Sequence, residues 1–260
     1  MSDRRLLFIP MYNCAPQIGR TLAQLTPERR AAFAEVFILD NGSTDGGPAV
    51  AVAAARTFPA GFVTVARNTR NVGLGGSHKV AFERCLERGL DGVVVLHGDD
   101  QGELGDLLPT LLADPKADNV LGARFAWGSR LKGYAPHRIL ANIAFNLIFS
   151  LTSFRWLTDL GSGLNWYSAR FLKAIDWAGC SDDLTFNYHL ILRSCAKRDL
   201  AMRFVPIGWR EDDQVSNAKL FRHGVSMLRI VGRHVFDRRR FLTEDHSTHA
   251  PPRTYEVLGP

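Results

Sequence analysis

Short, continuous apolar runs recur through the first half of the chain, and they constrain its fold more than any other feature. They cover residues 6–10, 36–39, 63–66, 93–96 and 120–123. Stretches with helical spacing of apolar residues lie between them, at residues 16–34, 47–57, 75–88 and 104–113. Strands buried on both faces read as unbroken apolar runs, and their alternation with helices is typical of a parallel sheet. We therefore predict an α/β fold with a mostly parallel sheet and helices on both of its faces.

The polar segments that follow these predicted strands contain the unusual residues of the chain. They span residues 10–13, 40–45, 68–76 and 97–101. Ligands of open α/β sheets bind beyond the carboxyl ends of the strands, where such segments meet. The sequence therefore predicts one binding site at this edge of the sheet.

Several common classes of nucleotide-binding and nucleic-acid-binding protein are disfavoured. The dinucleotide fingerprint Gly-x-Gly-x-x-Gly follows a first strand, whereas the glycine-rich segment 71–78 follows the third and has His78 at the last glycine position. The Gly-Lys-Ser or Gly-Lys-Thr of a P-loop is absent. The net charge is +6, but no zinc pattern, basic zipper or aromatic RNA-binding signature accompanies it. Hydride transfer, P-loop hydrolysis and nucleic-acid binding are therefore not expected.

Asp99 and Gln101 follow the fourth predicted strand and suit a divalent cation. Mg²⁺ typically takes one or two protein carboxylates and completes its shell with phosphate oxygens. Such an ion neutralises charge on a leaving diphosphate. We predict that Asp99 and Gln101 hold Mg²⁺ or Mn²⁺, and that Asp100 between them points elsewhere. Asp40, at the end of the second strand, is predicted to accept hydrogen bonds from a base or a ribose.

Four of these segments together resemble the inverting family 2 glycosyltransferases of the GT-A fold. They are Pro10-Met11-Tyr12-Asn13, Asp40-Asn41-Gly42-Ser43-Thr44-Asp45, Asn68-Thr69-Arg70-Asn71-Val72-Gly73 and Asp99-Asp100-Gln101. Three later segments resemble the dolichyl-phosphate mannose synthase branch of that family. They are Gly122-Ala123-Arg124-Phe125, Asp159-Leu160-Gly161-Ser162-Gly163-Leu164 and Val215-Ser216-Asn217-Ala218-Lys219-Leu220. The resemblance covers roughly residues 5–225.

The resemblance implies a hexosyltransferase that uses a UDP- or GDP-sugar. The residues implied in nucleotide binding are Pro10, Tyr12, Asn13, Asp40, Ser43, Asn71, Gly73, Gly75 and Asp99. The residues implied in catalysis are Asp99 and four phosphate clamps, Arg124, Arg138, Arg210 and Lys219. The chain departs from the family at Cys14, where Glu is common, and at His97, which replaces the first Asp of the mannose synthases' Asp-x-Asp. The nucleotide base, the sugar and any contact of His97 with the metal therefore stay open.

Three functions remain open at this point. A polyprenyl phosphate, of the dolichyl or undecaprenyl type, is already anionic, so metal-assisted transfer to it with inversion needs no general base. A glycan hydroxyl does need a base, and Asp182, Asp183, Glu211 and Asp212 are the carboxylates available for it. Asp182 and Asp183 are equally placed to cap a helix from Leu184. The third function, of another class, is non-catalytic binding of sugar nucleotides by the same fold. We favour the polyprenyl phosphate.

Two later segments favour a place at a membrane surface. Residues 139–157 are mostly apolar, with a polar stripe at Asn142, Asn146, Ser150 and Ser153, which indicates a helix packed on the domain or lying at an interface rather than spanning a membrane. Residues 218–242 are predicted to be a basic amphipathic helix, following a GT-A domain at 1–217. Residues 243–260 are expected to be a loose tail.

The expected location is the cytoplasm, with the protein peripheral at the cytoplasmic face of the membrane. The apolar run after Arg5 is too short for the core of a signal peptide. The four cysteines, Cys14, Cys85, Cys180 and Cys195, form no CxxC pair, which predicts buried free thiols in a reducing compartment. The sequence does not indicate an oligomeric state.

Overall fold

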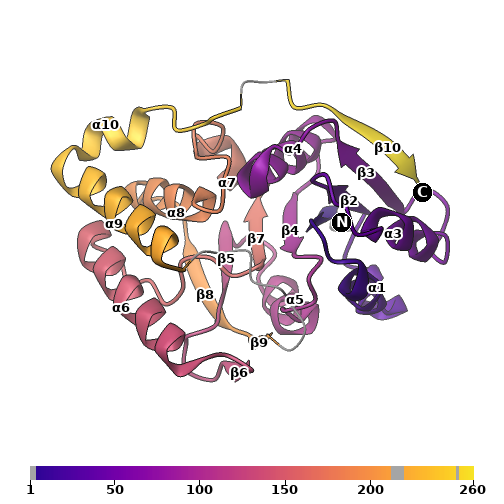
Figure 1. The fold of residues 1–260 in the computed structure, drawn as a ribbon, viewed down its shortest axis with the longest axis horizontal. Coiled ribbons are helices and arrows are strands. Elements are labelled where there is room, and N and C mark those ends of the chain that lie inside the picture. Colours follow the sequence, from indigo (N-terminus) through magenta and orange to yellow (C-terminus); the bar gives the residue numbers. More distant parts are fainter. Residues whose placement is uncertain (1–3, 212–219, 250–251) are drawn as a thin grey trace.

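An eight-stranded sheet forms the centre of the protein, in the order β10-β3-β2-β1-β4-β7-β5-β8 (Figure 1). The computed structural model describes residues 4–211, 220–249 and 252–260. The strands are β1 (Arg5–Met11), β2 (Glu35–Asp40), β3 (Val63–Asn68), β4 (Gly92–Leu96), β5 (Asn119–Ala123), β7 (Leu164–Ser168), β8 (Met202–Pro206) and β10 (Tyr255–Gly259). All five predicted strands are present, and the prediction of a mostly parallel α/β sheet is confirmed. β7 lies antiparallel between β4 and β5, so the two are not neighbours in the sheet.

Helices cover both faces of the sheet, as predicted. α1 (Ala15–Ala23), α3 (Gly47–Ala55) and α5 (Leu104–Ala113) build a core on one face, and α4 (Gly73–Glu87), α7 (Ala169–Ala174) and α8 (Phe186–Ala196) build a second core on the other. The single helix predicted over 16–34 is wrong. It is divided into α1 and the short α2 (Pro27–Arg30), because Pro27 has no N–H to continue a helix and instead starts a new one behind the cap of Thr26.

α6 (Pro136–Ser153) buries the polar stripe that the sequence pattern indicated. The Nδ2 of Asn146 donates to the carbonyl of Thr158 at 2.7 Å, and the Oγ of Ser150 accepts from the N–H of Leu157 at 2.9 Å. The outer face of α6 is apolar instead, with Leu140, Leu147 and Leu151 exposed. Of the helices within the described residues, none has both the length and the apolar character to cross a membrane.

The C-terminal part of the chain runs back across the molecule. α9 (Leu220–Phe236) lies beside α6, and α10 (Arg238–Thr243) follows it (Figure 1). The expected loose tail is wrong for residues 255–259, because β10 pairs antiparallel with β3 and covers that edge of the sheet. The ring of Tyr255 packs on Phe37 with 5.4 Å between centroids. The four cysteines are buried and free, as predicted.

Candidate active site

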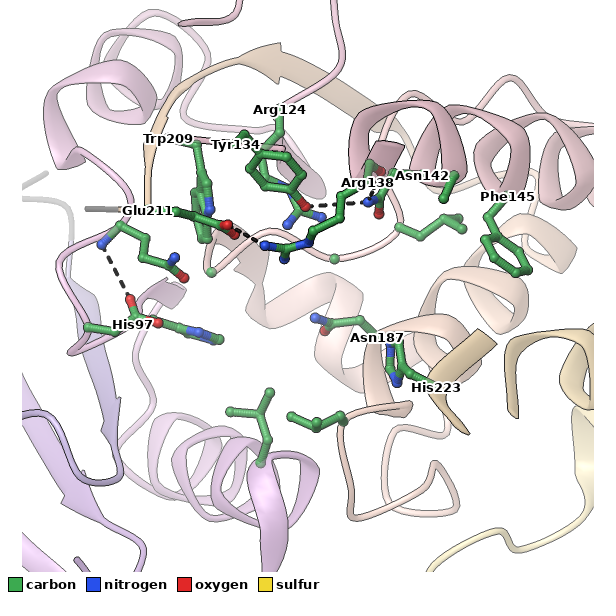
Figure 2. A pocket seen from close by; sticks show the side chains of 18 of the residues that line it. His97, Arg124, Tyr134, Arg138, Asn142, Phe145, Asn187, Trp209, Glu211 and His223 are labelled. Carbon is green, nitrogen blue, oxygen red and sulfur yellow. Dashed lines mark hydrogen bonds and ion pairs between the residues drawn. The ribbon is translucent and has the colours of Figure 1, made fainter. Parts of the chain in front are cut away.

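A pocket of about 490 Å³ lies at the carboxyl ends of β1, β4 and β5. Residues from the segments after these strands line it, together with residues of α6, α8 and α9 (Figure 2). The segments after β2 and β3 lie next to it rather than in its wall, apart from Leu74. They are tied to the first loop and to each other: the N–H of Asn13 donates to Ser43 at 2.9 Å, and Asn41 donates to Asn71 at 2.8 Å. The predicted convergence of the four polar segments is therefore observed.

Asp99 and Gln101 both line the pocket. Burial raises the pKa of the Asp99 carboxyl to about 6, although the N–H of Gln101 donates to it. A cation at this place would favour the ionised carboxylate. Within the described residues, no three His, Cys, Asp or Glu side chains are grouped to hold a metal. One carboxylate and one amide oxygen fit an ion that takes its other ligands from a bound diphosphate.

Asp100 points away from the pocket, as predicted. Its φ of 58° turns the chain at this residue, and its buried carboxylate pairs with Arg20 at 2.8 Å and Arg210 at 2.5 Å. Arg210 also donates from Nε to the carbonyl of Asp100. The predicted clamp at Arg210 is therefore engaged outside the pocket wall, because a buried carboxylate needs cationic partners.

Two of the other predicted clamps do line the pocket. Arg124 donates through Nε and NH2 to the two carboxylate oxygens of Asp159, at 2.8 and 2.7 Å, and lies 5.2 Å from the ring centroid of Trp209. Burial alone would lower the pKa of Arg124, but the ion pair with Asp159 raises it. Arg138, in the first turn of α6, pairs with Glu211 and stacks 4.6 Å from the ring centroid of Tyr134. Both guanidinium groups are thus held in fixed positions.

Lys219 and the motif Val215–Lys219 lie outside the described residues, as does Asp212. The clamp predicted at Lys219 therefore remains a prediction from the resemblance alone.

The residues predicted to bind the nucleotide divide into two groups. Tyr12 and Asn13 line the pocket. Pro10 is buried within β1, where its carbonyl accepts from the N–H of Gly98. Asp40 is also fully buried, and its carboxylate accepts from Nε of Arg67 at 2.7 Å and from the N–H of Ser43 at 3.1 Å. In this structure Asp40 therefore holds the turn after β2 rather than facing the pocket.

Gly73 and Gly75 hold α4 against the segment that precedes α8. A Cβ on Gly73, whose φ is +75°, would lie 2.2 Å from the carbonyl oxygen of Asp182. A Cβ on Gly75 would lie 2.3 Å from the carbonyl oxygen of Ser181. Asn71 accepts from the N–H of Gly73 at 3.0 Å. The structure therefore requires these glycines for close packing, and their predicted contact with a nucleotide stays a prediction.

Asp182 is not positioned as a general base. Its carboxylate is buried and accepts from Lys79 at 2.7 Å, from Arg253 at 3.2 Å and from the N–H groups of Thr248 and His249. Burial opposes ionisation, but Lys79 and the two N–H groups lower the pKa of Asp182 to about 2.

Asp183 accepts from the N–H and hydroxyl of Thr185 directly before α8. The helix cap predicted for Asp182 or Asp183 is wrong, because α8 begins at Phe186 rather than at Leu184 and its N-cap residue is Thr185. Of the described carboxylates proposed as bases, Glu211 alone lines the pocket.

Other lining residues were not predicted as site residues from the sequence. Asn187 and Tyr188 lie on α8, and His223 lies on α9. The hydroxyl of Tyr188 and Nε2 of His223 are 2.7 Å apart. His97 also lines the pocket, and burial lowers its pKa to about 4. A helical pattern shows which residues share a face, but not which face meets a pocket.

Comparisons with known proteins show which sequences and folds this chain resembles. The family model described as "Glycosyl transferase family 2" matches residues 7–176. An undecaprenyl-phosphate mannosyltransferase of Micrococcus luteus is 32% identical over 176 residues, which are 66% of this chain and 70% of that protein.

Two solved structures share the fold at low sequence identity. Glucosyl-3-phosphoglycerate synthase of Mycobacterium tuberculosis, in complex with Mn²⁺, UDP and phosphoglyceric acid, superposes with a TM-score of 0.64 at 16% identity, covering 89% of this chain and 78% of that one. Mannosyl-3-phosphoglycerate synthase of Rubrobacter xylanophilus superposes with a TM-score of 0.65 at 18% identity, covering 95% and 78%.

Proposed function

The chain belongs to glycosyl transferase family 2, and we propose from this premise that it transfers a sugar from a UDP- or GDP-sugar to a polyprenyl phosphate. The observation that carries the proposal is the composition of the pocket. One part of its lining is polar: Asp99 and Gln101 offer oxygens to a cation, and Arg124 and Arg138 offer guanidinium groups to phosphate. Another part of its lining is apolar and is formed by Ala141 and Phe145 of α6, Met227 of α9, and the loop residues Leu160 and Leu184. A lipid phosphate likewise has a charged phosphate group and an apolar chain, and the Micrococcus relative is named for such an acceptor.

The proposed reaction needs charge neutralisation and positioning rather than a base. An oxygen of the lipid phosphate attacks the anomeric carbon as the bond to the diphosphate breaks, which inverts that carbon. Asp99 and Gln101 would hold Mg²⁺ or Mn²⁺, which supplies positive charge for the leaving diphosphate. Arg124 and Arg138, fixed by Asp159 and Glu211, screen the repulsion between the two anionic reactants. Fixed cations lower the barrier more than mobile ones because they do not reorganise during the reaction.

The acceptor is tested by supplying membranes with radiolabelled UDP- and GDP-sugars. Label should enter a fraction that organic solvent extracts and mild acid releases, because a sugar phosphate ester of an isoprenoid has both properties. Membranes without the enzyme give the background. Label that appears only in water-soluble oligosaccharide or polymer would contradict the polyprenyl-phosphate proposal.

The outer face of α6 supports a place at the membrane surface. Leu140, Leu147 and Leu151 are 70%, 49% and 66% exposed, and Phe154 and Trp156 extend the apolar surface beyond the helix. The neighbouring helices add exposed positive charge, at Arg229, Arg233, Arg239 and Arg240. An apolar face bordered by Arg is typical of helices that lie on anionic lipid. In this orientation the pocket wall formed by α6 and α9 would lie next to the lipid.

Acidic substitutions on the apolar face of α6 should weaken its binding to lipid. Replacing Leu147 and Leu151 with Asp should weaken binding to vesicles of phosphatidylglycerol and phosphatidylcholine by at least about 10-fold, because two exposed leucines lose their apolar contacts. Sedimentation with the vesicles measures the change. Leu112→Asp is the control, since Leu112 is 56% exposed on α5, away from this face. Equal binding by the double variant and the wild type would show that α6 does not contact lipid.

Glu211 favours a second function, transfer to a hydroxyl acceptor. It is a carboxylate in the pocket wall, where a general base is needed for a hydroxyl. Glu211→Gln would abolish transfer to a hydroxyl but only weaken transfer to a phosphate. The labelling experiment separates the two acceptors directly.

A further inference from the structure

Several side chains in the pocket wall carry buried polar atoms without hydrogen-bond partners among the described residues. In Arg138 and Trp209 these atoms are the donors Nε and Nε1. Two others can accept a hydrogen bond: Oδ1 of Asn187, whose side chain is 8% exposed, and Nε2 of His97. A buried polar atom without a partner destabilises the free protein, because it has lost its hydrogen bonds to water. Most buried polar groups are satisfied, so an exception calls for an explanation such as a missing ligand.

The side chains of Asn187 and His97 lie on either side of the backbone at Gly161–Gly163. A Cβ on Gly161 would lie 3.0 Å from Nδ2 of Asn187, and a Cβ on Gly163 would lie 2.5 Å from Cγ of His97. Figure 2 shows both side chains directed into the pocket from different elements, His97 from the segment after β4 and Asn187 from α8. The two glycines therefore allow both polar groups to approach the same stretch of backbone and face the same space.

The chemistry of the two groups selects the kind of ligand. An amide oxygen accepts hydrogen bonds and does not donate them, so its partner must be a donor. The oxygens of an ionised diphosphate are acceptors only, whereas a sugar hydroxyl both donates and accepts. A neutral imidazole nitrogen can serve as donor or acceptor according to its tautomer. Hydroxyl groups are thus the ligand atoms that satisfy both Asn187 and His97.

We propose that Asn187 and His97 hydrogen-bond the hydroxyl groups of the transferred sugar and select which sugar nucleotide the enzyme uses. This inference rests on the proposed function, since it requires a sugar-nucleotide donor. Asp99 is two residues from His97, so the diphosphate and the sugar would occupy adjoining parts of the pocket. A site that hydrogen-bonds a hydroxyl discriminates strongly against sugars that place it differently, because the protein group is then left unpaired.

The test is Asn187→Leu, which keeps the volume and removes the amide. Donor use is measured with UDP- and GDP-linked glucose, galactose and mannose, and binding of UDP and GDP alone is measured by calorimetry. The variant should lose about 10- to 100-fold in kcat/KM for the preferred sugar nucleotide and discriminate less among the hexoses. Its affinity for UDP and GDP should stay within about twofold of the wild type, because neither contains the sugar.

The temperature of unfolding distinguishes a ligand-binding role of Asn187 from a structural one. Asn187→Leu should unfold at the same temperature as the wild type or higher, because it removes an unsatisfied buried oxygen. Asn146→Leu is the matched control: it removes the hydrogen bond from Asn146 on α6 to the carbonyl of Thr158, so it should unfold at a lower temperature and keep the donor preference. If Asn187→Leu does not fold, Gly161→Ala replaces it, since the added Cβ would displace the Asn187 amide and alter donor preference in the same way.

Three results would overturn the inference. Equal losses of affinity for UDP or GDP and for the sugar nucleotide would place Asn187 on the nucleotide or diphosphate. An unchanged donor preference in an active variant would exclude a role in sugar selection, while leaving the proposed function intact. A wild type that neither binds nor consumes any UDP- or GDP-sugar would overturn the proposed function together with this inference.

Discussion

Asp99→Ala should reduce sugar transfer by about 1,000-fold or more, because the charge stabilisation held at this position is worth several kcal/mol, at about 1.4 kcal/mol for each tenfold change in rate. Steady-state transfer with Mg²⁺ or Mn²⁺ measures the effect. The variant should also respond less to added metal than the wild type. It should remain folded, since burial disfavours the ionised carboxylate of Asp99 and raises its pKa to about 6. Removing this carboxylate therefore relieves a cost in the free protein.

Asp199→Ala is the matched control for this experiment. Asp199 is 70% exposed, makes a long ion pair of 3.7 Å with Arg170, and does not line the pocket. Its removal should leave transfer unchanged. If Asp99→Ala kept transfer within about tenfold of the wild type, the metal would not depend on Asp99, because loss of a metal ligand costs more than that.

Asp182→Ala should lower the free energy of unfolding by about 3–5 kcal/mol, because it leaves a buried charge without its partner. Lys79 is fully buried and pairs with Asp182 at 2.7 Å, and Arg253 is 4% exposed and pairs with the same carboxylate. Without that carboxylate, two positive charges would remain together in the core. Urea unfolding measures the change, which is a large part of the roughly 5–15 kcal/mol that stabilises a typical domain.

The pH dependence of stability provides an independent check on Asp182. Its pKa is lowered from 3.8 to about 2 in the folded protein. The stabilisation is therefore fully present above about pH 4 and is lost as the pH falls toward 2, where the folded form also takes up the proton. The stability of the Asp182→Ala variant should therefore not show this decrease between about pH 4 and pH 2. Asp199→Ala should change stability by less than about 1 kcal/mol, since its ion pair is exposed. An equally small effect for Asp182→Ala would mean that the buried network does not stabilise the fold.

The strand-end segments show why part of the site could be predicted from local sequence. A continuous apolar run such as 93–96 is buried on both faces, so the polar residues after it must leave the sheet at its carboxyl edge. Asp99 and Gln101 follow that run directly, and both line the pocket. Arg124 follows β5 in the same way. For these residues, chain position alone determines the location.

The buried network around Asp182 shows where such reasoning fails. The pair Asp182–Asp183 has the composition of a catalytic carboxylate pair or of a helix cap, and local sequence cannot separate these. Lys79 is 103 positions away from Asp182, and Arg253 is 71 positions away. The protonation and role of Asp182 depend on these distant cations, and Asp40 is likewise engaged by Arg67 of the adjacent strand.

The five apolar runs therefore determined the sheet and its carboxyl edge, and the run at 93–96 determined the place of Asp99 and Gln101, because burial on two faces requires an apolar strand and leaves polar residues at its end. Only the tertiary structure decided which way α6 turns its polar stripe, that β10 closes the edge of the sheet, and that Asn187 faces the pocket. Those features depend on which surfaces meet across long separations in sequence. Such contacts are set by the packing of whole elements, which no local pattern of residues records.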